Sequence, residues 1–177
     1  MNICFRLIGT FLVVTALFYS SLALSSGYLL DESWPKYPSN MKFEMGSGVA
    51  VDSQGIVYLF TRDIEHWAAH PLAMSDRMGR STVSMFDASG AYLGKWGPSD
   101  QPGFALGAHA MYIDSEEMFW FVDRDGHVVK KYDREGKLLL TLGEMGKWGN
   151  DSRHFNGPTA VIVQANGNLV VLSLIHI

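Results

Sequence analysis

Three short apolar runs along the chain each open with a polar side chain and close, five residues later, at an Asp or a Gln. The polar residues that open them are Ser47, His109 and Thr159. Imidazole is a common zinc ligand, so His109 is the one of the three that could bind a metal. A lone histidine is more often a packed or surface residue than a ligand, and the spacing alone therefore favours a structural role.

Arg62 and the segment after it form a second group of reactive side chains. Arg62 closes an apolar strand predicted at 56–61, and residues 63–80 interrupt the chain's repeat with His66, Trp67 and further polar side chains. Such insertions are where function is often grafted onto a scaffold, and an unspecific surface excursion is the alternative. From its position alone, a strand-end arginine such as Arg62 is expected to form a surface ion pair, because such pairs are common and weak.

The elements that must position these residues repeat along the chain. Turns of the Asp-x-x-Gly kind separate short apolar strands, and Asp87 and Asp133 mark the same turn in two successive copies. Four short strands in each stretch of roughly 40–50 residues are typical of a β-propeller blade. The third copy starts near Phe155 and reaches only its second strand, at 168–172. Since propellers close with about four to eight blades, the sequence predicts an all-β fold, present as an incomplete fragment of about two and a half blades.

Residues 1–25 have the pattern of a secretory signal peptide. A short basic start is followed by an almost unbroken apolar run, which small residues close at Ser21-Leu22-Ala23. A membrane anchor is the alternative, because the run is near the length that spans a bilayer. The only cysteine, Cys4, lies inside this segment, so the mature chain would have neither a disulfide nor a free thiol. We expect a secreted or extracytoplasmic protein, periplasmic if bacterial, with no stable membrane association after signal cleavage.

The rest of the chain divides into a lead-in at 26–43 and a partial propeller at 44–177, which is truncated in its third blade. Pro35 and Pro38 block a helix or a central strand, so the lead-in is predicted to be extended. The sequence leaves open whether the tail at 173–177 is native. The 177 residues are 47% hydrophobic and 18% charged with a net charge of −4, which indicates a soluble globular class and argues against a nucleic-acid partner.

Several of these runs resemble those of the NHL-repeat propellers. The runs that carry the likeness are Gly48-Val49-Ala50-Val51-Asp52, Leu59-Phe60-Thr61-Arg62, Ser84-Met85-Phe86-Asp87, Gly107-Ala108-His109-Ala110-Met111-Tyr112-Ile113-Asp114 and Val129-Lys130-Lys131-Tyr132-Asp133. Among NHL propellers the chain is most similar to the peptidyl-α-hydroxyglycine α-amidating lyases. The resemblance implies a six-bladed β-propeller, of which residues 44–172 match the first half.

The resemblance also implies a reaction and its ligands. A small peptide-derived substrate, a peptidyl-α-hydroxyglycine, would be split at its C–N bond into a peptide amide and glyoxylate. His109 matches the first of three histidines, on alternate blades, that hold an axial zinc, and Arg62 matches an arginine that holds the end of the substrate. Backbone carbonyls of Val49 and Met111 match ligands of a structural calcium. The other zinc ligands, the calcium carboxylate and the tyrosine proposed as base belong past residue 172, and zinc against another divalent metal stays open.

Two departures from the family pattern concern substrate binding. Thr61 stands where the family has a histidine before the arginine, and the following His-x-Trp is loosened to Glu65-His66-Trp67, so His66 and Trp67 are candidates for a substrate loop. A non-catalytic extracellular NHL propeller acting as a binding module is therefore an alternative. A different metal-dependent propeller lyase or lactonase is another.

Two further patterns complete the sequence predictions. Asn150-Asp151-Ser152 forms an N-glycosylation sequon in a predicted loop, a weak signal that has no meaning in a bacterium. The tryptophans of the repeats are expected to pack between blades rather than to form a ligand platform. These are Trp96, Trp120 and Trp148.

Overall fold

A computed structural model describes most of the chain after its first apolar segment. The described residues are 29–41, 45–62, 81–101 and 103–174. The chain divides into two units, Met1–Asp31 and Glu32–Ile177, and every described strand belongs to the second. Within the described ranges, no helix has the length and apolarity needed to cross a bilayer.

Two of the sequence predictions lie outside the described residues. They concern the signal peptide at 1–25 and the insertion at 63–80, which contains His66 and Trp67. Part of the lead-in is described, and it lies against the outer strands of the first sheet. The Tyr37 ring is 5.2 Å from that of Phe86 and 6.2 Å from that of Tyr92, measured between centroids.

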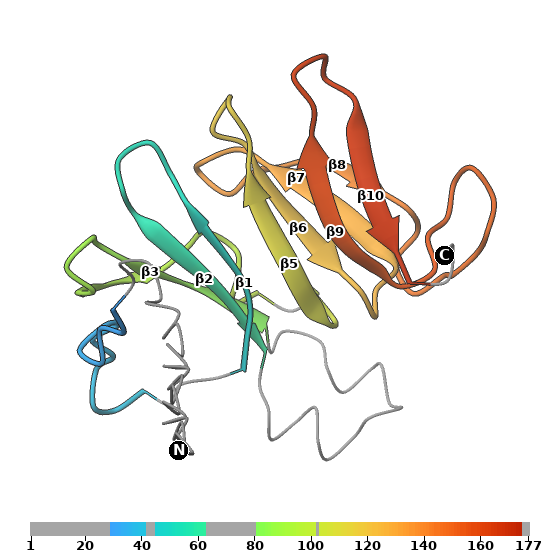
Figure 1. Ribbon diagram of the computed structural model, residues 1–177. Coiled ribbons are helices and arrows are strands. Elements are labelled where there is room, and N and C mark those ends of the chain that lie inside the picture. The colour runs from blue at the N-terminus through green and yellow to red at the C-terminus, as the bar shows by residue number, and fades with distance from the viewer. Residues whose placement is uncertain (1–28, 42–44, 63–80, 102, 175–177) are drawn as a thin grey trace, which may run out of the picture. The chain divides into compact units, whose positions relative to one another are not determined.

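The described strands form three antiparallel sheets in chain order, as Figure 1 shows. The first sheet contains β1 (Met45–Val51), β2 (Val57–Arg62), β3 (Ser81–Phe86) and β4 (Tyr92–Lys95). The second contains β5 (Ala108–Ile113), β6 (Phe119–Asp123), β7 (Val128–Tyr132) and β8 (Leu138–Leu142). The third pairs β9 (Pro158–Val163) with β10 (Leu169–Ser173). Two four-stranded meanders and the start of a third confirm the predicted propeller blades.

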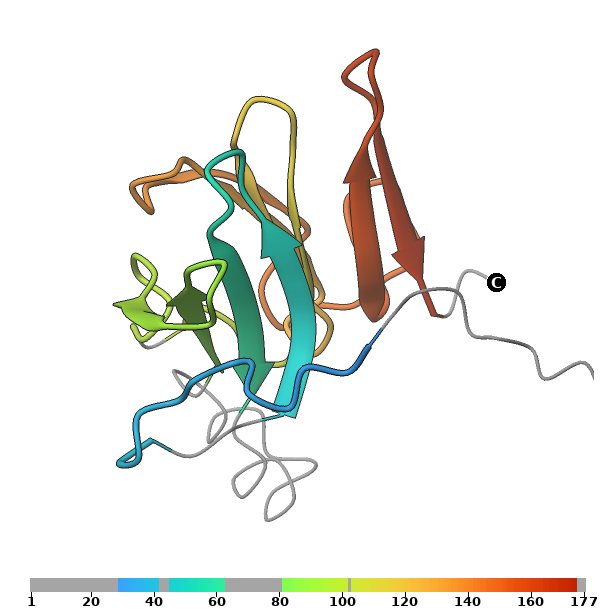
Figure 2. The same cartoon turned by 60° about the vertical axis from the view of Figure 1, so that its left-hand side comes forward.

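The sheets stand side by side with their first strands next to one another. Figures 1 and 2 both show β1, β5 and β9 as neighbours, and residues of β5 contact both β1 and β9. In a propeller the first strand of each blade is the one nearest the central channel. We therefore call β1, β5 and β9 the inner strands.

Aspartates at the turns explain why the strands end where they do. Each turn aspartate accepts backbone N–H groups on Oδ1, and for Asp52 the donors are Gln54 and Ile56, both at 2.9 Å. The same arrangement recurs at Asp87 and Asp114, and Asp133 Oδ1 accepts the Lys137 N–H. The fourth residue of the turn needs a left-handed backbone, which Gly55 supplies at φ 80°. Glu117 takes that place in the second copy at φ 60°.

The core lies between adjacent sheets, and β6 contributes to it on both faces. All five residues of β6 are buried. Phe119 and Phe121 pack against aromatic residues of the first sheet and against Trp96, which directly follows β4. Phe119 stacks on Trp96 with 4.8 Å between ring centroids. Trp120 and Val122 face the third sheet and pack against it. A strand covered on both sides reads as a continuous apolar run rather than an alternating one.

Two tryptophans confirm the packing prediction and one contradicts it. Trp96 and Trp120 are 4% and 3% exposed. Trp148 is 67% exposed, so the prediction that it packs between blades is wrong. It lies in the connection between β8 and β9, which extends beyond the sheets instead of between them.

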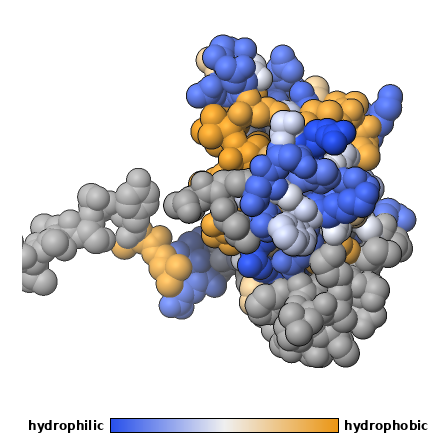
Figure 3. Space-filling model, turned by 90° about the vertical axis from the view of Figure 1, so that its right-hand side faces the viewer, coloured by the Kyte–Doolittle hydropathy of each residue, from blue (hydrophilic) through white to orange (hydrophobic). Residues whose placement is uncertain are grey.

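The third sheet presents an apolar surface. Figure 3, which views the molecule from the side of β10, shows apolar area among polar residues. The exposed apolar side chains of β9 and β10 are Ile162, Val170 and Leu172. Among the described strands none pairs with the far edge of β10.

Candidate functional site at the start of the inner strands

The three inner strands share an irregularity at the same place. In β5 the pairing moves from Ala108–Asp123 to Ala110–Val122, which leaves His109 as the extra residue of a β-bulge. The same shift leaves Ser47 extra in β1 and Thr159 extra in β9. The bulges confirm the alignment predicted from the sequence. A β-bulge turns a side chain away from the regular alternation and often lies beside an active site.

Hydroxyl side chains at the bulge bond within their own sheet. Ser47 Oγ donates to the carbonyl oxygen of Phe60 on β2 at 3.0 Å. Thr159 Oγ1 donates to the carbonyl oxygen of Leu172 on β10 at 3.2 Å. In both sheets, therefore, the extra residue is held by a backbone acceptor on the neighbouring strand.

His109 differs because its half-buried imidazole reaches the next sheet. Its Nδ1 lies 3.0 Å from the carbonyl oxygen of Thr159. A carbonyl can only accept, so Nδ1 is the donor, and in a neutral imidazole Nε2 would then keep its lone pair. Metal-binding histidines typically have this arrangement, in which the second ring nitrogen donates to a backbone carbonyl and fixes both tautomer and ring orientation.

A buried carboxylate and a buried ammonium fix the loop that leads into β5. Asp123 accepts the backbone N–H groups of Leu106, Gly107 and Gly126, each at 2.8 Å. Burial raises the pKa of Asp123, and the three N–H donors and the charge of Lys130 oppose that rise.

Lys130 acts on the same loop from β7. Its Nζ donates to the carbonyl oxygens of Gly103 and Phe104, at 3.0 and 2.7 Å. Burial lowers the pKa of Lys130, and the charge of Asp123 acts in the opposite direction. The sequence predictions gave neither residue a role. Asp123 has the same local pattern as the aspartates of the other turns, and Lys130 acts on carbonyls 26 and 27 residues before it.

A second imidazole, in the turn between β6 and β7, contacts the residue that precedes β9. His127 Nδ1 accepts the backbone N–H of Gly157 at 3.1 Å, two residues before the carbonyl that receives His109. Burial lowers the pKa of His127, while the charges of Asp125 and Asp123 raise it. The start of β9 is thus held by two histidines of the second sheet.

The carbonyls of Val49 and Met111 point away from their partner strands. The Asp52 N–H donates to Ile56 O at 3.1 Å, and the Asp114 N–H donates to Met118 O at 3.0 Å. The residue pairs Asp52–Ile56 and Asp114–Met118 are therefore hydrogen-bonded pairs of their ladders. Hydrogen-bonded and non-bonded pairs alternate along an antiparallel ladder, so the pairs of Val49 and Met111 are non-bonded ones. Their carbonyls face the free edge of β1 and β5, an orientation that suits a cation such as calcium.

Gly48 allows β1 and β5 to approach each other. A Cβ atom at Gly48 would lie 2.7 Å from the backbone nitrogen of Met111 and 3.1 Å from the carbonyl carbon of Ala110. The equivalent residues after the other two bulges, Ala110 and Ala160, are also small. The structure thereby brings the Val49 and Met111 backbones close together.

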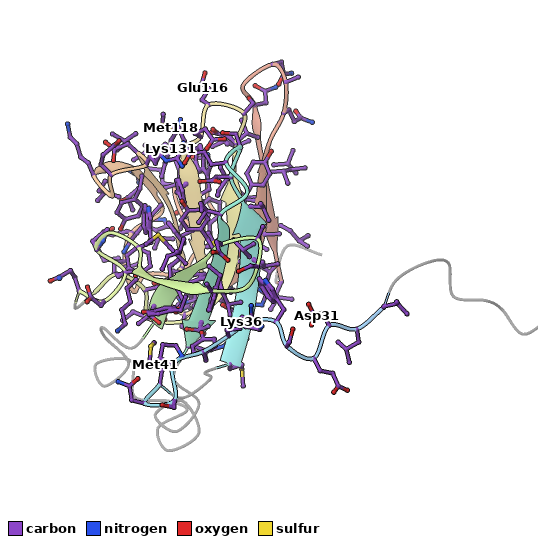
Figure 4. All side chains as sticks on the ribbon, turned by 90° about the vertical axis from the view of Figure 1, so that its left-hand side faces the viewer. Asp31, Lys36, Met41, Glu116, Met118 and Lys131 are labelled. Atoms are coloured by element: carbon purple, nitrogen blue, oxygen red, sulfur yellow. The ribbon has the colours of Figure 1, made fainter. Side chains whose placement is uncertain are left out.

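Arg62 and His109 lie at corresponding ends of the first and second sheets. It ends β2, where it pairs in register with Met45 at the start of β1, and His109 is the second residue of β5. The turn between β5 and β6, where Figure 4 labels Glu116 and Met118, is at the opposite end. Arg62 and His109 therefore share one rim of the blades, although they come from different sheets.

Among the described residues no group of three His, Cys, Asp or Glu side chains is placed to hold a metal ion. His109 is thus a single potential ligand, supported by the Thr159 carbonyl. Its surroundings fit a metal-binding imidazole without completing a site.

Comparison with known proteins agrees with the fold. No known family model matches the chain. It is 30% identical to human NHL repeat-containing protein 3 over 155 residues, which cover 82% of this chain and 39% of that protein. It is 28% identical over 133 residues to a probable peptidyl-alpha-hydroxyglycine alpha-amidating lyase of Caenorhabditis elegans, covering 71% of this chain and 37% of the relative. For peptidyl-alpha-hydroxyglycine alpha-amidating lyase 2 of Drosophila melanogaster the identity is 26%, with 81% and 36% covered.

Solved structures give a more distant likeness. Virginiamycin B lyase from Staphylococcus aureus superimposes with a TM-score of 0.48 at 14% identity, covering 73% of this chain and 35% of the lyase. A streptogramin B lyase gives 0.40 at 12%, with 77% and 43% covered. The chain spans well under half the length of the curated relatives above. It is an all-β chain of propeller blades that resembles NHL-repeat proteins and amidating lyases over most of its length.

Proposed function

We propose that this chain belongs to a secreted or extracytoplasmic lyase that resembles peptidylamidoglycolate lyase. The reaction would cleave the C–N bond of a peptidyl-α-hydroxyglycine to a peptide amide and glyoxylate. One observation carries the proposal. The bulge of the inner strands holds a hydroxyl residue in two sheets, and in the second sheet it holds His109, whose Nδ1 donates to Thr159 O. The worm and fly relatives support it, since both are named as amidating lyases.

The residues of the rim would divide the work. His109 would bind zinc through Nε2, while the Thr159 carbonyl holds the ring in place. Bound zinc would lower the pKa of the substrate's hydroxyl, as it does for water. Arg62 would orient the substrate's terminal group and offset the charge that develops on oxygen as the C–N bond opens. The carbonyls of Val49 and Met111 would contribute to a structural calcium site that ties β1 to β5.

A binding module is the second candidate function. The chain is 30% identical to human NHL repeat-containing protein 3, and a repeat propeller can present its loops to a partner without catalysis. A different metal-dependent lyase or lactonase of the same architecture would use the same rim. A binding module differs from both kinds of enzyme because its rim would hold no catalytic metal. The two kinds of enzyme differ in the product that they release.

Metal analysis and product release test the proposal. The purified protein, in the longest form that its gene encodes, is expected to retain zinc and to release glyoxylate from an α-hydroxyglycine peptide. His109→Thr should lose both, while Ser47→Ala, at the matching bulge of the first sheet, should keep both. Zinc without glyoxylate would favour another metal-dependent reaction, and a protein with neither would favour the binding module.

A further inference from the structure

The connection between β8 and β9 displays a sequon that the proposed reaction does not use. Asn150-Asp151-Ser152 is the only Asn-x-Ser/Thr sequence in the 177 residues. All three of its residues are exposed. Sequons that receive a glycan lie on surface loops of secreted proteins, where the bulky sugar meets no neighbouring structure.

The loop holds the sequon in a defined conformation. The Gly149 N–H donates to Phe155 O at 3.1 Å, which closes residues 149–155 at their base. Asp151 Oδ1 accepts the Arg153 N–H at 2.8 Å, and the same carboxylate bonds His154 Nδ1 at 2.9 Å. Both contacts direct the Asp151 side chain back onto the loop.

Trp148 provides a second, independent observation. It is 67% exposed, whereas Trp96 and Trp120 are 4% and 3% exposed. It precedes the sequon's asparagine by two residues. One face of an N-acetylglucosamine ring consists of C–H groups, which can pack on an indole, and covering so large an apolar side chain is favourable.

We propose that Asn150 carries an N-linked glycan whose first sugar packs against Trp148. The side-chain amide nitrogen of Asn150 would form a bond to C1 of an N-acetylglucosamine while the bond from C1 to the diphosphate of a polyprenyl-linked oligosaccharide breaks. The polyprenyl diphosphate leaves, and the amide gives up one proton. The inference rests on the secretory route proposed above and requires a host that has this donor.

Secretion from cultured animal cells tests the site. The full chain, secreted with its own residues 1–25, should gain mobility in gel electrophoresis when peptide N-glycosidase removes the sugar. Asn150→Gln and Ser152→Ala should abolish that mobility change, and Ser152→Thr should keep it because the hydroxyl is retained. Asn40→Gln is the matched control, since it removes an exposed asparagine outside any sequon. Secreted protein without a glycan would overturn the proposal.

The packing on Trp148 has its own readout. Enzymatic removal of the glycan should increase acrylamide quenching of the tryptophan fluorescence, and Trp148→Ala should keep the glycan but lose this increase. Equal quenching of the glycosylated and the deglycosylated protein would refute the contact between the sugar and Trp148.

Entry into the secretory pathway is tested separately. A chain that stays in the cytosol with its own residues 1–25 would overturn both the proposed route and the modification in the native protein. The same chain behind an established leader then shows whether the loop is a competent acceptor.

Discussion

Gly48→Ala should separate the first two sheets where the inner strands approach each other. The added Cβ would lie 2.7 Å from Met111 N, with the Ala110 carbonyl carbon and Cα at 3.1 and 3.2 Å. All three are backbone atoms, so relief requires β1 or β5 to move. Gly46→Ala is the matched control on the same strand, because its Cβ would meet only Leu59 Cδ1 at an ordinary 3.5 Å.

The expected magnitude follows from comparing the two variants. Each replaces a glycine by alanine in β1, so both gain about 0.4–1 kcal/mol from the less flexible unfolded chain. Only Gly48→Ala adds a native-state clash, and overpacking of this kind costs about 1–3 kcal/mol. Gly48→Ala should therefore unfold about 1–3 kcal/mol more easily than Gly46→Ala in urea, with the same dependence on denaturant. Equal midpoints would refute the close approach of β1 and β5.

Two further predictions concern the buried charges and the second imidazole. Asp123→Asn should lower the free energy of unfolding in a urea titration by about 1–3 kcal/mol, since the new amide group leaves a buried backbone N–H without its acceptor. Asp87→Asn, at an exposed turn, is the control and should change this free energy by less than about 0.5 kcal/mol. Because the folded pKa of His127 is lowered, its contribution to stability is complete above the unfolded value of about 6.5 and is lost as the pH falls through the folded pKa. His127→Asn, which tolerates the backbone φ of 57° at this position, should reduce the loss of stability between neutral and mildly acidic pH, and an unchanged pH profile of the unfolding midpoint would contradict this.

Local patterns were enough to predict the blades. The turns at Asp52 and Asp87 depend on a carboxylate that accepts the backbone N–H groups of the residues two and four positions later. Contacts between residues so close in the sequence can be predicted from the local pattern. The equivalence of Ser47, His109 and Thr159 could be predicted for the same reason, since each lies five residues before its turn.

Contacts between sheets could not be predicted from these patterns. His109 contacts a carbonyl 50 residues away, and Lys130 contacts a loop 26 residues before it. Asp123 has the local sequence of a turn aspartate, yet burial against the loop before β5 makes it an internal acceptor. The sequence predicts that Trp148 packs between blades together with Trp96 and Trp120, but its loop places it in solvent.

All three sheets have the bulge, so any metal binding there depends on the side chain that occupies it. In the first and third sheets a hydroxyl at the bulge donates to the second strand, and Val122 offers the equivalent carbonyl beside His109. His109→Thr should therefore form this bond and unfold within about 0.5 kcal/mol of the wild type. His109→Ala has no donor and should lose about 0.5–1.5 kcal/mol. Loss of zinc in the threonine variant would then reflect the missing imidazole rather than unfolding, whereas two equally destabilised variants would show that the three bulges are not interchangeable.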